Sequence, residues 1–391
     1  MDNHSQMSHT KLRTQTFATE AIALHVPLRL LASAKKTLSP HLLGIKGVSS
    51  IRPCPEDTTI KYVLVKHSDP LPCDVLSFLA SHSLTHSPYT LHRSYDELTV
   101  AEALRHLLPS SIPIPSSYET VGHLIHLNLL EEHEPFKFDI GRVFLDKIKS
   151  VKTVVNKSSS ISNQFRVFPM EFLAGEENTI VKVKENGIIF SFDFKLVYWN
   201  SRLHKEHERL VNHIIKQSNH QSNHSVADVF AGIGPFVLPL SKELNGVIYA
   251  NDLNPDSVKF MKQSISLNKI SNDNLQIFNL DGKEFIGKMM EKEVQPDHFI
   301  LNLPANSIDF VEEFKKYEIR KKIEVHIYAF SRQSDPCDDV INQIVSILGN
   351  IEVRGSFIVR DVAPNKSMVR VDFALNSRVS EVPPIKQKRV E

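Results

Sequence analysis

The sequence is poor in cysteine and has no cysteine pair with the spacing of a metal-ligand motif. Cys54, Cys73 and Cys337 are the three cysteines among 391 residues. An odd, scattered set of this kind excludes a disulfide framework and a cysteine zinc site, and it suits a reducing compartment.

An excess of one charge and a long apolar run are also missing. The chain has 46 basic and 45 acidic residues, which argues against a uniformly basic coat for nucleic acid but leaves room for a local basic patch. No run of 18 apolar residues occurs, so we expect no transmembrane helix. The first 19 residues lack the apolar segment of a secretory signal. We expect a disordered tail over residues 1–16, with a weak mitochondrial presequence as the alternative.

Two phosphate-binding motifs are missing as well. There is no Gly-rich loop ending in Lys-Ser/Thr, and Asp228-Val-Phe-Ala-Gly-Ile-Gly-Pro-Phe236 is too short for the dinucleotide fingerprint, since Pro235 stands where the helix would open. What is present is a buried strand running into the glycine turn of Gly232 and Gly234. A second strand follows and ends at Asp252, whose carboxylate can accept both hydroxyls of a ribose. These features predict a nucleoside ligand without a pyrophosphate, and S-adenosylmethionine fits that description.

Two further strand ends carry polar residues. Asp281-Gly282 closes a third strand, where an acid can accept from an adenine amino group and a glycine lets the base lie against the backbone. Asn302-Leu-Pro304 closes a fourth strand at the edge where ligands bind in such sheets. Leu303 replaces the second proline that amine-methylating enzymes carry here, which favours a ring nitrogen as the target. Each of the two segments is also compatible with a plain turn.

The segment before the glycine turn is dense in polar residues and contains the single tryptophan. Glu206 and His207 fall on the first turns of a predicted helix over residues 203–217. A carboxylate there can act as a general base, although the pattern alone favours a capped, charged helix start.

The length predicts two or three domains. We expect a disordered tail (1–16), an N-terminal α+β domain (17–112) ending at a proline-rich linker, a middle α+β domain (118–202), a Rossmann-like α/β domain with a parallel-rich sheet (203–378), and a disordered tail (379–391). Lysines and arginines cluster over residues 137–157, where they form either a solvated face or a phosphate-binding surface.

Collinear motifs over residues 118–375 closely resemble the eukaryotic and archaeal tRNA (guanine-N1) methyltransferase family. The motifs are His123-Leu-Ile-His-Leu-Asn-Leu129, Thr153-Val-Val-Asn-Lys157, Phe165-Arg-Val-Phe168, Leu173-Ala-Gly-Glu176, Val197-Tyr-Trp-Asn-Ser-Arg-Leu203, Glu206-His-Glu-Arg209, Asp228 to Phe236, Asn251-Asp-Leu-Asn-Pro255, Asn302-Leu-Pro304 and Val359-Arg-Asp-Val-Ala-Pro-Asn-Lys366. The N-terminal domain resembles the family only loosely.

The resemblance implies a class I methyltransferase fold and methylation of N1 of guanine 37 of tRNA by S-adenosylmethionine. It implies that Glu206 removes the N1 proton, that Arg166 stabilises charge on O6, and that Asn302 holds the guanine. The remaining residues that it implies divide into two groups. Those for the cofactor are His207, Phe230, Gly232, Gly234, Asp252, Leu253, Asp281, Gly282, Asn302 and Pro304, and those for the substrate are Tyr198, Asn200 and Arg202.

The resemblance further implies that tRNA is the partner. We expect no membrane association, no metal and a monomer. We expect the protein in the cytoplasm and nucleus, with the mitochondrial matrix as a further compartment. Candidate RNA contacts are Arg354, Arg360, Lys366, Arg370 and the basic cluster of the middle domain, and the N-terminal domain would recognise the tRNA elbow. The alternatives are the related aminocarboxypropyl transferase of wybutosine synthesis and a non-catalytic tRNA-binding module.

Overall fold

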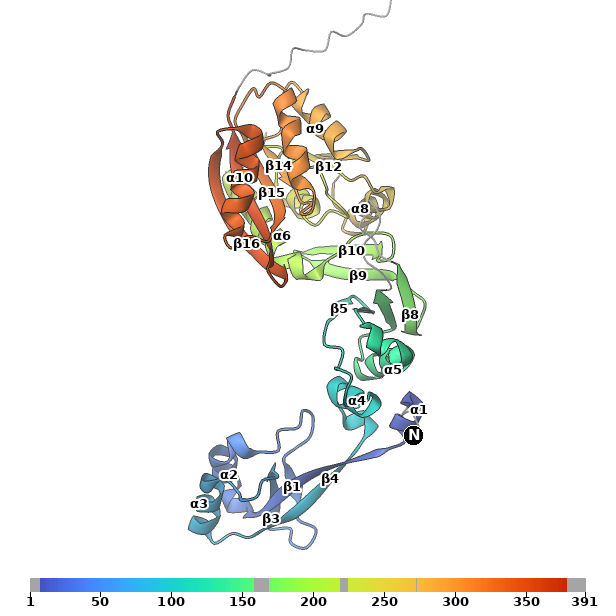
Figure 1. Cartoon of the computed structure of the whole chain (residues 1–391), viewed down its shortest axis with the longest axis vertical. Helices are drawn as coiled ribbons and strands as arrows, with labels where there is room; N and C mark the ends of the chain where they lie inside the picture. The colour runs from blue at the N-terminus through green and yellow to red at the C-terminus, as the bar shows by residue number, and fades with distance from the viewer. Residues whose placement is uncertain (1–7, 158–168, 219–223, 272, 378–391) are drawn as a thin grey trace, which may run out of the picture. The chain divides into compact units, whose positions relative to one another are not determined.

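The computed structural model describes residues 8–157, 169–218, 224–271 and 273–377 (Figure 1). Internal contacts group the chain into two compact units. Unit 1 comprises Met1–Tyr118, Ile125–Asn156 and Glu171–Glu177, and unit 2 comprises Glu119–Leu124, Lys157–Met170 and Asn178–Glu391. None of the described helices is both long and apolar enough to cross a membrane.

Unit 1 contains an antiparallel sheet of order β2-β3-β1-β4, and a second sheet in which β6, β7 and β8 are neighbours. Its strands, counting those that lie mostly in it, are β1 (Thr16–Pro27), β2 (Ile51–Pro53), β3 (Ile60–Lys66), β4 (His86–Ser94), β6 (Leu124–Leu127), β7 (Thr153–Lys157) and β8 (Met170–Gly175). Its α-helices are α1 (His9–Arg13), α2 (Leu31–Thr37), α3 (Cys73–His82), α4 (Val100–Leu107) and α5 (Lys137–Lys147).

The start of α4 shows why a helix forms there. Thr99 and Glu102 form a reciprocal capping box, in which the Thr99 side chain accepts from the Glu102 backbone and the Glu102 side chain accepts from that of Thr99. Helix α1 corrects the predicted tail, because Leu12 is fully buried in the core of unit 1. Residues 1–7 of the first predicted tail and all of the second, 379–391, lie outside the described residues.

Unit 2 contains a seven-stranded sheet of order β13-β12-β11-β14-β15-β17-β16. The first five strands in this order are parallel, while β17 runs antiparallel to β15 and β16. The strands of this sheet are β11 (Val226–Asp228), β12 (Ile248–Asn251), β13 (Leu275–Phe278), β14 (His298–Leu301), β15 (Ile323–Ser331), β16 (Glu352–Ala363) and β17 (Lys366–Leu375). The predicted Rossmann-like α/β fold is confirmed. The predicted three-domain division stays a prediction.

Helices accompany the strands of unit 2, as a parallel sheet requires. They are α6 (His204–Ser218), α7 (Val237–Glu243), α8 (Pro255–Leu267), α9 (Gly282–Met290), α10 (Pro336–Leu348) and the 3₁₀ segments η5 (Ser201–Leu203) and η6 (Ser307–Lys316). Phe285, Phe299, Phe314 and Phe373 lie fully buried in the core of this unit. Truncating such a core phenylalanine to alanine typically costs about 3–5 kcal/mol, so this packing holds the strand ends in place.

A separate hairpin of unit 2 is formed by β9 (Ile180–Glu185) and β10 (Ile188–Asp193). Its two turn residues, Asn186 and Gly187, have positive φ angles of 47° and 74°, as a tight hairpin turn between right-twisted strands requires. Asn268 at the end of α8 fixes the hairpin. Its side chain accepts from the Ile189 amide at 2.8 Å and donates to the Ile189 carbonyl at 2.7 Å.

Candidate active site

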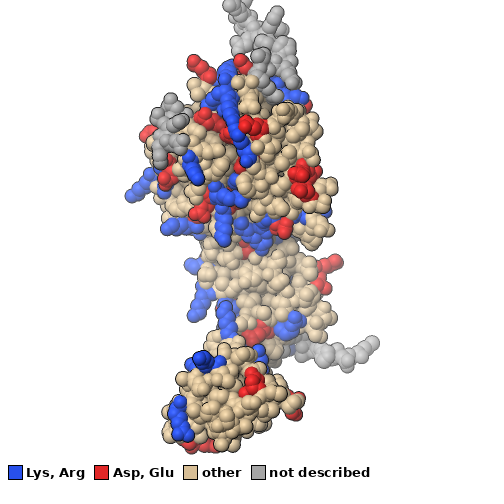
Figure 2. All heavy atoms as spheres, turned by 90° about the vertical axis from the view of Figure 1, so that its left-hand side faces the viewer, with Lys and Arg blue, Asp and Glu red and all other residues tan. Residues whose placement is uncertain are grey.

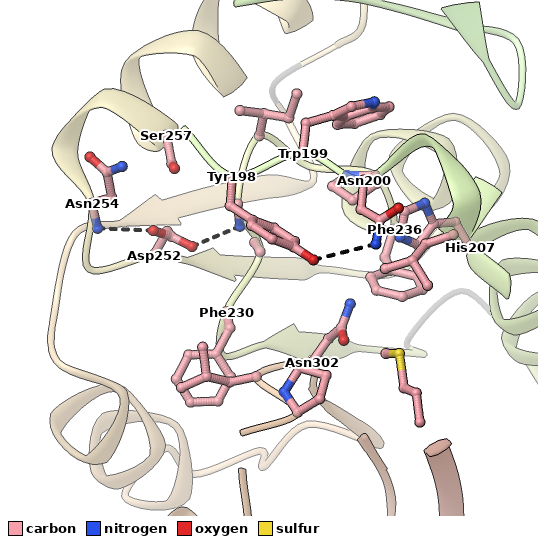
Figure 3. A pocket seen from close by; sticks show the side chains of 18 of the residues that line it. Tyr198, Trp199, Asn200, His207, Phe230, Phe236, Asp252, Asn254, Ser257 and Asn302 are labelled. Carbon is pink, nitrogen blue, oxygen red and sulfur yellow. Dashed lines mark hydrogen bonds between the residues drawn. The ribbon is translucent and has the colours of Figure 1, made fainter. Parts of the chain in front are cut away.

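The strand order of unit 2 reverses between β11 and β14, the point at which open α/β sheets bind ligands. A pocket of about 520 Å³ lies there, within unit 2. The segments that follow β11, β12, β13 and β14 all contribute to its lining (Figure 3). The four strand ends singled out in the sequence therefore meet at one site.

Most of the predicted site residues line this pocket. They are Tyr198, Asn200, Arg202, His207, Phe230, Gly232, Asp252, Leu253, Asp281, Gly282, Asn302 and Pro304. Gly234 and Glu206 do not line it, and Arg166 lies outside the described residues.

Asp252 is the carboxylate that closes β12. Its Oδ2 accepts from the Gly232 amide at 2.8 Å and its Oδ1 from the Asn254 amide at 2.9 Å. Burial raises the pKa of Asp252, while the two amides and the Ser257 hydroxyl oppose that rise. The carboxylate thus holds the glycine turn closed and retains lone pairs for a ligand's hydroxyl groups.

Gly282 lets two aromatic side chains lie close against its backbone at the pocket wall, and we call this place the Gly282 cradle. A Cβ at this position would lie 2.7 Å from Cε1 of Phe310 and 2.9 Å from Cε1 of Phe230. These two rings meet edge to face with centroids 4.8 Å apart, so they offer an apolar wall for a nucleobase.

Gly234 supports the turn without contacting the pocket. Its φ is +97°, and a Cβ there would lie 2.8 Å from Cγ of Leu238. It was predicted to bind the cofactor; the structure instead assigns it to the packing of α7 against the turn.

Asn302 follows β14, and the backbone around it is fixed on both sides. The Leu303 amide donates to Oγ of Ser307 at 2.9 Å, and the Phe330 amide donates to the Pro304 carbonyl at 3.0 Å. The Asn302 side chain lies in the pocket (Figure 3) and makes no hydrogen bond with another described residue. Its carboxamide can therefore both donate to and accept from a ligand.

The segment before α6 forms another wall of the pocket. The Ser201 amide and hydroxyl both donate to Oε1 of Glu119, at 2.8 and 2.6 Å, and Asn200 accepts from the Arg202 amide at 3.1 Å. Tyr198 remains 45% exposed. The wall is rigid, and it presents an aromatic face that a flipped base can stack on.

Glu206 lies on the first turn of α6, as predicted, but its carboxylate is held away from the pocket. It is only 7% exposed. The Tyr328 hydroxyl and Nη1 of Arg370 both donate to its Oε1 at 2.8 Å, and Nη2 of Arg209 contacts its Oε2 at 2.6 Å. We call these three donors the Glu206 clamp. Burial and the negative charge of Glu206 raise the pKa of Tyr328 well above its usual value, so this phenol stays a donor.

Arg370 corrects a prediction. The sequence suggested an RNA contact, but Arg370 is 2% exposed and bridges Glu206 to Asp372, whose Oδ2 lies 3.1 Å from its Nη2. Arg354, another predicted RNA contact, is paired with Glu352 and Glu324.

His207 lies in the pocket wall next to Glu206. Its Nδ1 lies 2.6 Å from Oε1 of Glu185, and both side chains are 6% exposed. Its ring meets that of Phe236 edge to face at 4.8 Å.

A buried polar network extends behind the sheet edge. His326 Nδ1 lies 2.8 Å from Oδ1 of Asp372, and His326 Nε2 lies 2.9 Å from His298 Nδ1. His213, His326 and Asp372 have potential metal-ligand atoms within 4.8 Å of one another, although no metal was predicted. The hydrogen bonds already engage both nitrogens of His326, which accounts for this cluster without a metal.

Several residues of the site were missed by the sequence reasoning. Phe236, Asn254, Ser257 and Phe310 line the pocket, and Glu185 reaches it through His207. Phe236 and Asn254 lie within segments that the motifs covered. Phe310 and Glu185 gave no signal in the sequence.

Comparisons with known proteins agree with this site. Residues 179–354 match the family described as TRM5/TYW2 methyltransferase domain, and residues 100–179 match the TYW2 N-terminal domain. A tRNA (guanine(37)-N(1))-methyltransferase of Phytophthora infestans is 36% identical over 381 residues, which cover 92% of this chain and 90% of that protein. A protein of the same name from Dictyostelium discoideum is 37% identical over 325 residues, covering 80% of this chain and 69% of that protein.

A solved structure shares the fold over nearly the whole chain. The crystal structure of Trm5b from Pyrococcus abyssi superposes with a TM-score of 0.64 at 25% identity, covering 90% of this chain and 98% of that one. The family match and the similarity over nine tenths of the Phytophthora protein lead to one conclusion. This chain belongs to the tRNA (guanine(37)-N(1))-methyltransferase family.

Proposed function

We propose that this chain transfers the methyl group of S-adenosylmethionine to N1 of guanine 37 of tRNA, and that the reaction takes place in the pocket of unit 2. One observation supports this most directly. The carboxamide of Asn302, which makes no hydrogen bond with another described residue, shares one cavity with the Asp252 carboxylate and the Gly282 cradle.

The residues at the strand ends fit an adenosine group. Asp252 would accept the ribose hydroxyls, and the adenine ring would lie at Gly282 against the wall formed by Phe230 and Phe310. The acid Asp281 is exposed beside that cradle and can accept from the adenine amino group. When bound, S-adenosylmethionine supplies a methyl group carried on a sulfonium centre.

The target guanine would enter from the side of Tyr198 and Asn302. Methylation at N1 requires the base to leave its stack, and Tyr198 offers a face for it. The Asn302 carboxamide presents a donor and an acceptor to the Watson–Crick edge of the guanine, where N1 lies. This pairing orients the guanine ring for methyl transfer. Such orientation accounts for much of the rate enhancement of a reaction between two bound molecules.

Guanine N1 carries a proton at neutral pH, so a base has to remove it. We assign this role to Glu206, as the family motif implies. Because its carboxylate is held by Tyr328, Arg370 and Arg209, it acts on the guanine only after leaving the clamp. Arg209 is 42% exposed at its side chain and is the donor that an incoming RNA phosphate can attract. We assign to Arg166 the stabilisation of the negative charge that develops on O6 of the guanine.

A groove next to the pocket is suited to the RNA backbone. Its volume is about 800 Å³, and it shares Arg202, Arg360 and Val362 with the pocket. Arg332 and Lys366 add positive charge to it, and Asp361 is its acid. Figure 2 faces the side of unit 2 that carries β16 and α10, and Lys and Arg gather there in patches between acids. Such patches contact phosphates without reading sequence.

The basic cluster of residues 137–157 is partly occupied by internal pairs. Lys137 bonds Glu134 and Glu171, and Arg142 bonds Asp139. Lys149 and Lys152 are exposed and stay candidates for phosphate contact.

We also propose that the N-terminal domain recognises the tRNA elbow and that the protein is a monomer. We propose that it is located in the cytoplasm and nucleus, with the mitochondrial matrix as a further compartment.

The test is methyl transfer from labelled S-adenosylmethionine to tRNA transcripts with G or A at position 37, with the product nucleoside identified. We expect 1-methylguanosine from the G37 transcript alone. Equal labelling of the A37 transcript would refute the assigned target. Transfer of an aminocarboxypropyl group, or binding without transfer, would refute the assigned chemistry.

A further inference from the structure

Phe357 lies on β16, at the edge of the seven-stranded sheet, and its ring contacts two donors of the Glu206 clamp. The guanidinium carbon of Arg370 lies 4.7 Å from the centre of the ring, and that of Arg209 lies 4.8 Å from it. Both distances are within the range of a cation–π contact. One aromatic ring thus touches both charged donors that hold Glu206.

The register of the sheet places Phe357 beside the clamp. Phe357 is directly opposite Arg370 in the antiparallel pair of β16 and β17, so the two side chains project from the same face of the sheet. Arg209 comes from α6, three residues after Glu206. Gly355 leaves space for the ring, because a Cβ there would lie 3.0 Å from Cε2 and from Cζ of Phe357. The contact therefore joins β16, β17 and α6 at the position of the clamp.

The two arginines lose compensating charge when Glu206 leaves the clamp. Arg370 is 2% exposed and also pairs with Asp372 at 3.1 Å, but its buried Nε has no hydrogen-bond partner in the described structure. Among the acids that the structure describes, Arg209 pairs with Glu206. After release, one carboxylate, that of Asp372, remains for two guanidinium groups. Uncompensated charge in a buried place is strongly disfavoured, so this state opposes the release of Glu206.

An aromatic face stabilises the arginines in that state. The negative face of a phenyl ring attracts a guanidinium group, and the attraction is strongest where water is excluded. In the clamped state, the Glu206 carboxylate cancels part of the positive charge that the ring experiences. The contact with Phe357 therefore strengthens as Glu206 leaves. The Tyr328 hydroxyl has the opposite effect, because it loses its hydrogen bond to Glu206 on release.

We propose that Phe357 is a positioning residue for Glu206. Its ring holds the guanidinium groups of Arg209 and Arg370 in place while the carboxylate is out of the clamp, and so it favours the release of Glu206 toward the guanine. This inference rests on the proposed function, because it takes Glu206 as the base. A ring that merely packed against the sheet would stabilise the clamped and the released states equally.

Single-turnover methyl transfer to a G37 transcript, at saturating S-adenosylmethionine and tRNA, is the first test. Phe357→Leu keeps an apolar side chain but removes the aromatic face, at a position that is 36% exposed. We expect the rate to fall about threefold to thirtyfold, the size of a cation–π contact, with the affinity for S-adenosylhomocysteine unchanged. Phe357→Tyr keeps the ring and should retain the wild-type rate.

A double-mutant cycle of equilibrium unfolding measures the same contact without turnover. Glu206→Gln removes the carboxylate charge but nearly keeps the size of the side chain, so it imitates the loss of charge on release. We expect Phe357→Leu to raise the unfolding equilibrium constant about threefold to thirtyfold more in the Glu206→Gln background than in the wild type. Val353→Ala, at a 40% exposed position of the same strand, is the matched control. It should leave the rate unchanged and combine additively with Glu206→Gln.

A wild-type rate in Phe357→Leu would overturn the proposal, and so would a rate in Phe357→Tyr as low as that of Phe357→Leu. Additive effects of Phe357→Leu and Glu206→Gln on unfolding would overturn it too, since the ring would then be indifferent to the charge of Glu206. If the wild-type protein forms no 1-methylguanosine, the proposed function fails, whereas the unfolding cycle still decides whether the ring supports the arginines. If 1-methylguanosine forms and the cycle is additive, only this inference fails.

Discussion

The family motifs imply the two central roles for Asn302 and Glu206, yet the structure leaves these two side chains in opposite states. The Asn302 carboxamide lies in the pocket without a hydrogen-bond partner among the described residues. The Glu206 carboxylate is buried behind the pocket wall and held by three donors. Under the proposed roles, the site can orient the guanine while Glu206 is still held in the clamp. Glu206 would then stay inactive until RNA arrives.

The largest effect is expected for Glu206→Gln. The amide is close in size to the carboxylate and can still accept from Tyr328, but it cannot take the N1 proton. Single-turnover methyl transfer to a G37 transcript should fall about 10²- to 10⁴-fold, the usual contribution of a general base. Affinity for S-adenosylhomocysteine should not change, and Glu208→Gln serves as the control on the same helix.

Asn302→Ala should have the next largest effect on the rate. Loss of a preorganised donor at the reacting base typically lowers turnover about 10²- to 10³-fold. Because Asn302 makes no hydrogen bond within the described protein, the variant should melt within about 1 °C of the wild type. A large loss of stability would contradict the assignment of a free carboxamide.

Tyr328→Phe tests whether the hydrogen bond that holds Glu206 in the clamp is also needed for the reaction of Glu206. The variant removes one donor from a buried carboxylate, so the free energy of unfolding should fall by about 1–2 kcal/mol. Because Glu206 has to leave the clamp to react, the single-turnover rate should rise or stay within about threefold of the wild type. A rate loss as large as that of Glu206→Gln would show that the clamped position is itself the active one.

Asp228 provides a second buried carboxylate for comparison, and the expected effect of changing it is on stability alone. Its Oδ1 accepts from the Phe230 amide at 3.2 Å, while its Oδ2 has no partner in the described structure. Burial raises the pKa of Asp228 well above 3.8, with the Phe230 amide opposing and Asp252 adding to the rise. A raised folded-state pKa of an acid means that its stabilising contribution is present below the unfolded pKa and is lost as pH rises through the folded pKa.

Asp228→Asn removes this titration. Within the window that opens near pH 4 and ends at the raised pKa, the unfolding free energy of the variant should rise relative to the wild type by on the order of 1 kcal/mol per pH unit. Denaturant titrations of both proteins between pH 4 and 8 measure the difference. A constant difference across that range would contradict the raised pKa.

Local signals in the sequence account for most of the site. Asp252, Gly282 and Asn302 each follow an apolar strand at a turn, and parallel strands bring such ends to one edge of the sheet. The same patterns predicted the parallel part of the seven-stranded sheet. Phe310 was missed because it lies within η6, where no strand end marks it.

The states of the predicted residues could not be inferred from the sequence, since they depend on distant contacts. The clamp donors Tyr328 and Arg370 lie 122 and 164 residues from Glu206 along the chain. No local pattern shows that Arg370 is buried in a network with Asp372, and its charge alone suggested an RNA contact. The pairing of Glu185 with His207 likewise depends on how the hairpin packs against α6.

The most direct test of the central claim is the single-turnover rate of Glu206→Gln on a G37 transcript under saturating S-adenosylmethionine. The account predicts a loss of about 10²-fold or more with cofactor affinity unchanged. A rate equal to that of the wild type would show that another group takes the N1 proton, and that the Glu206 clamp is only part of the folded core.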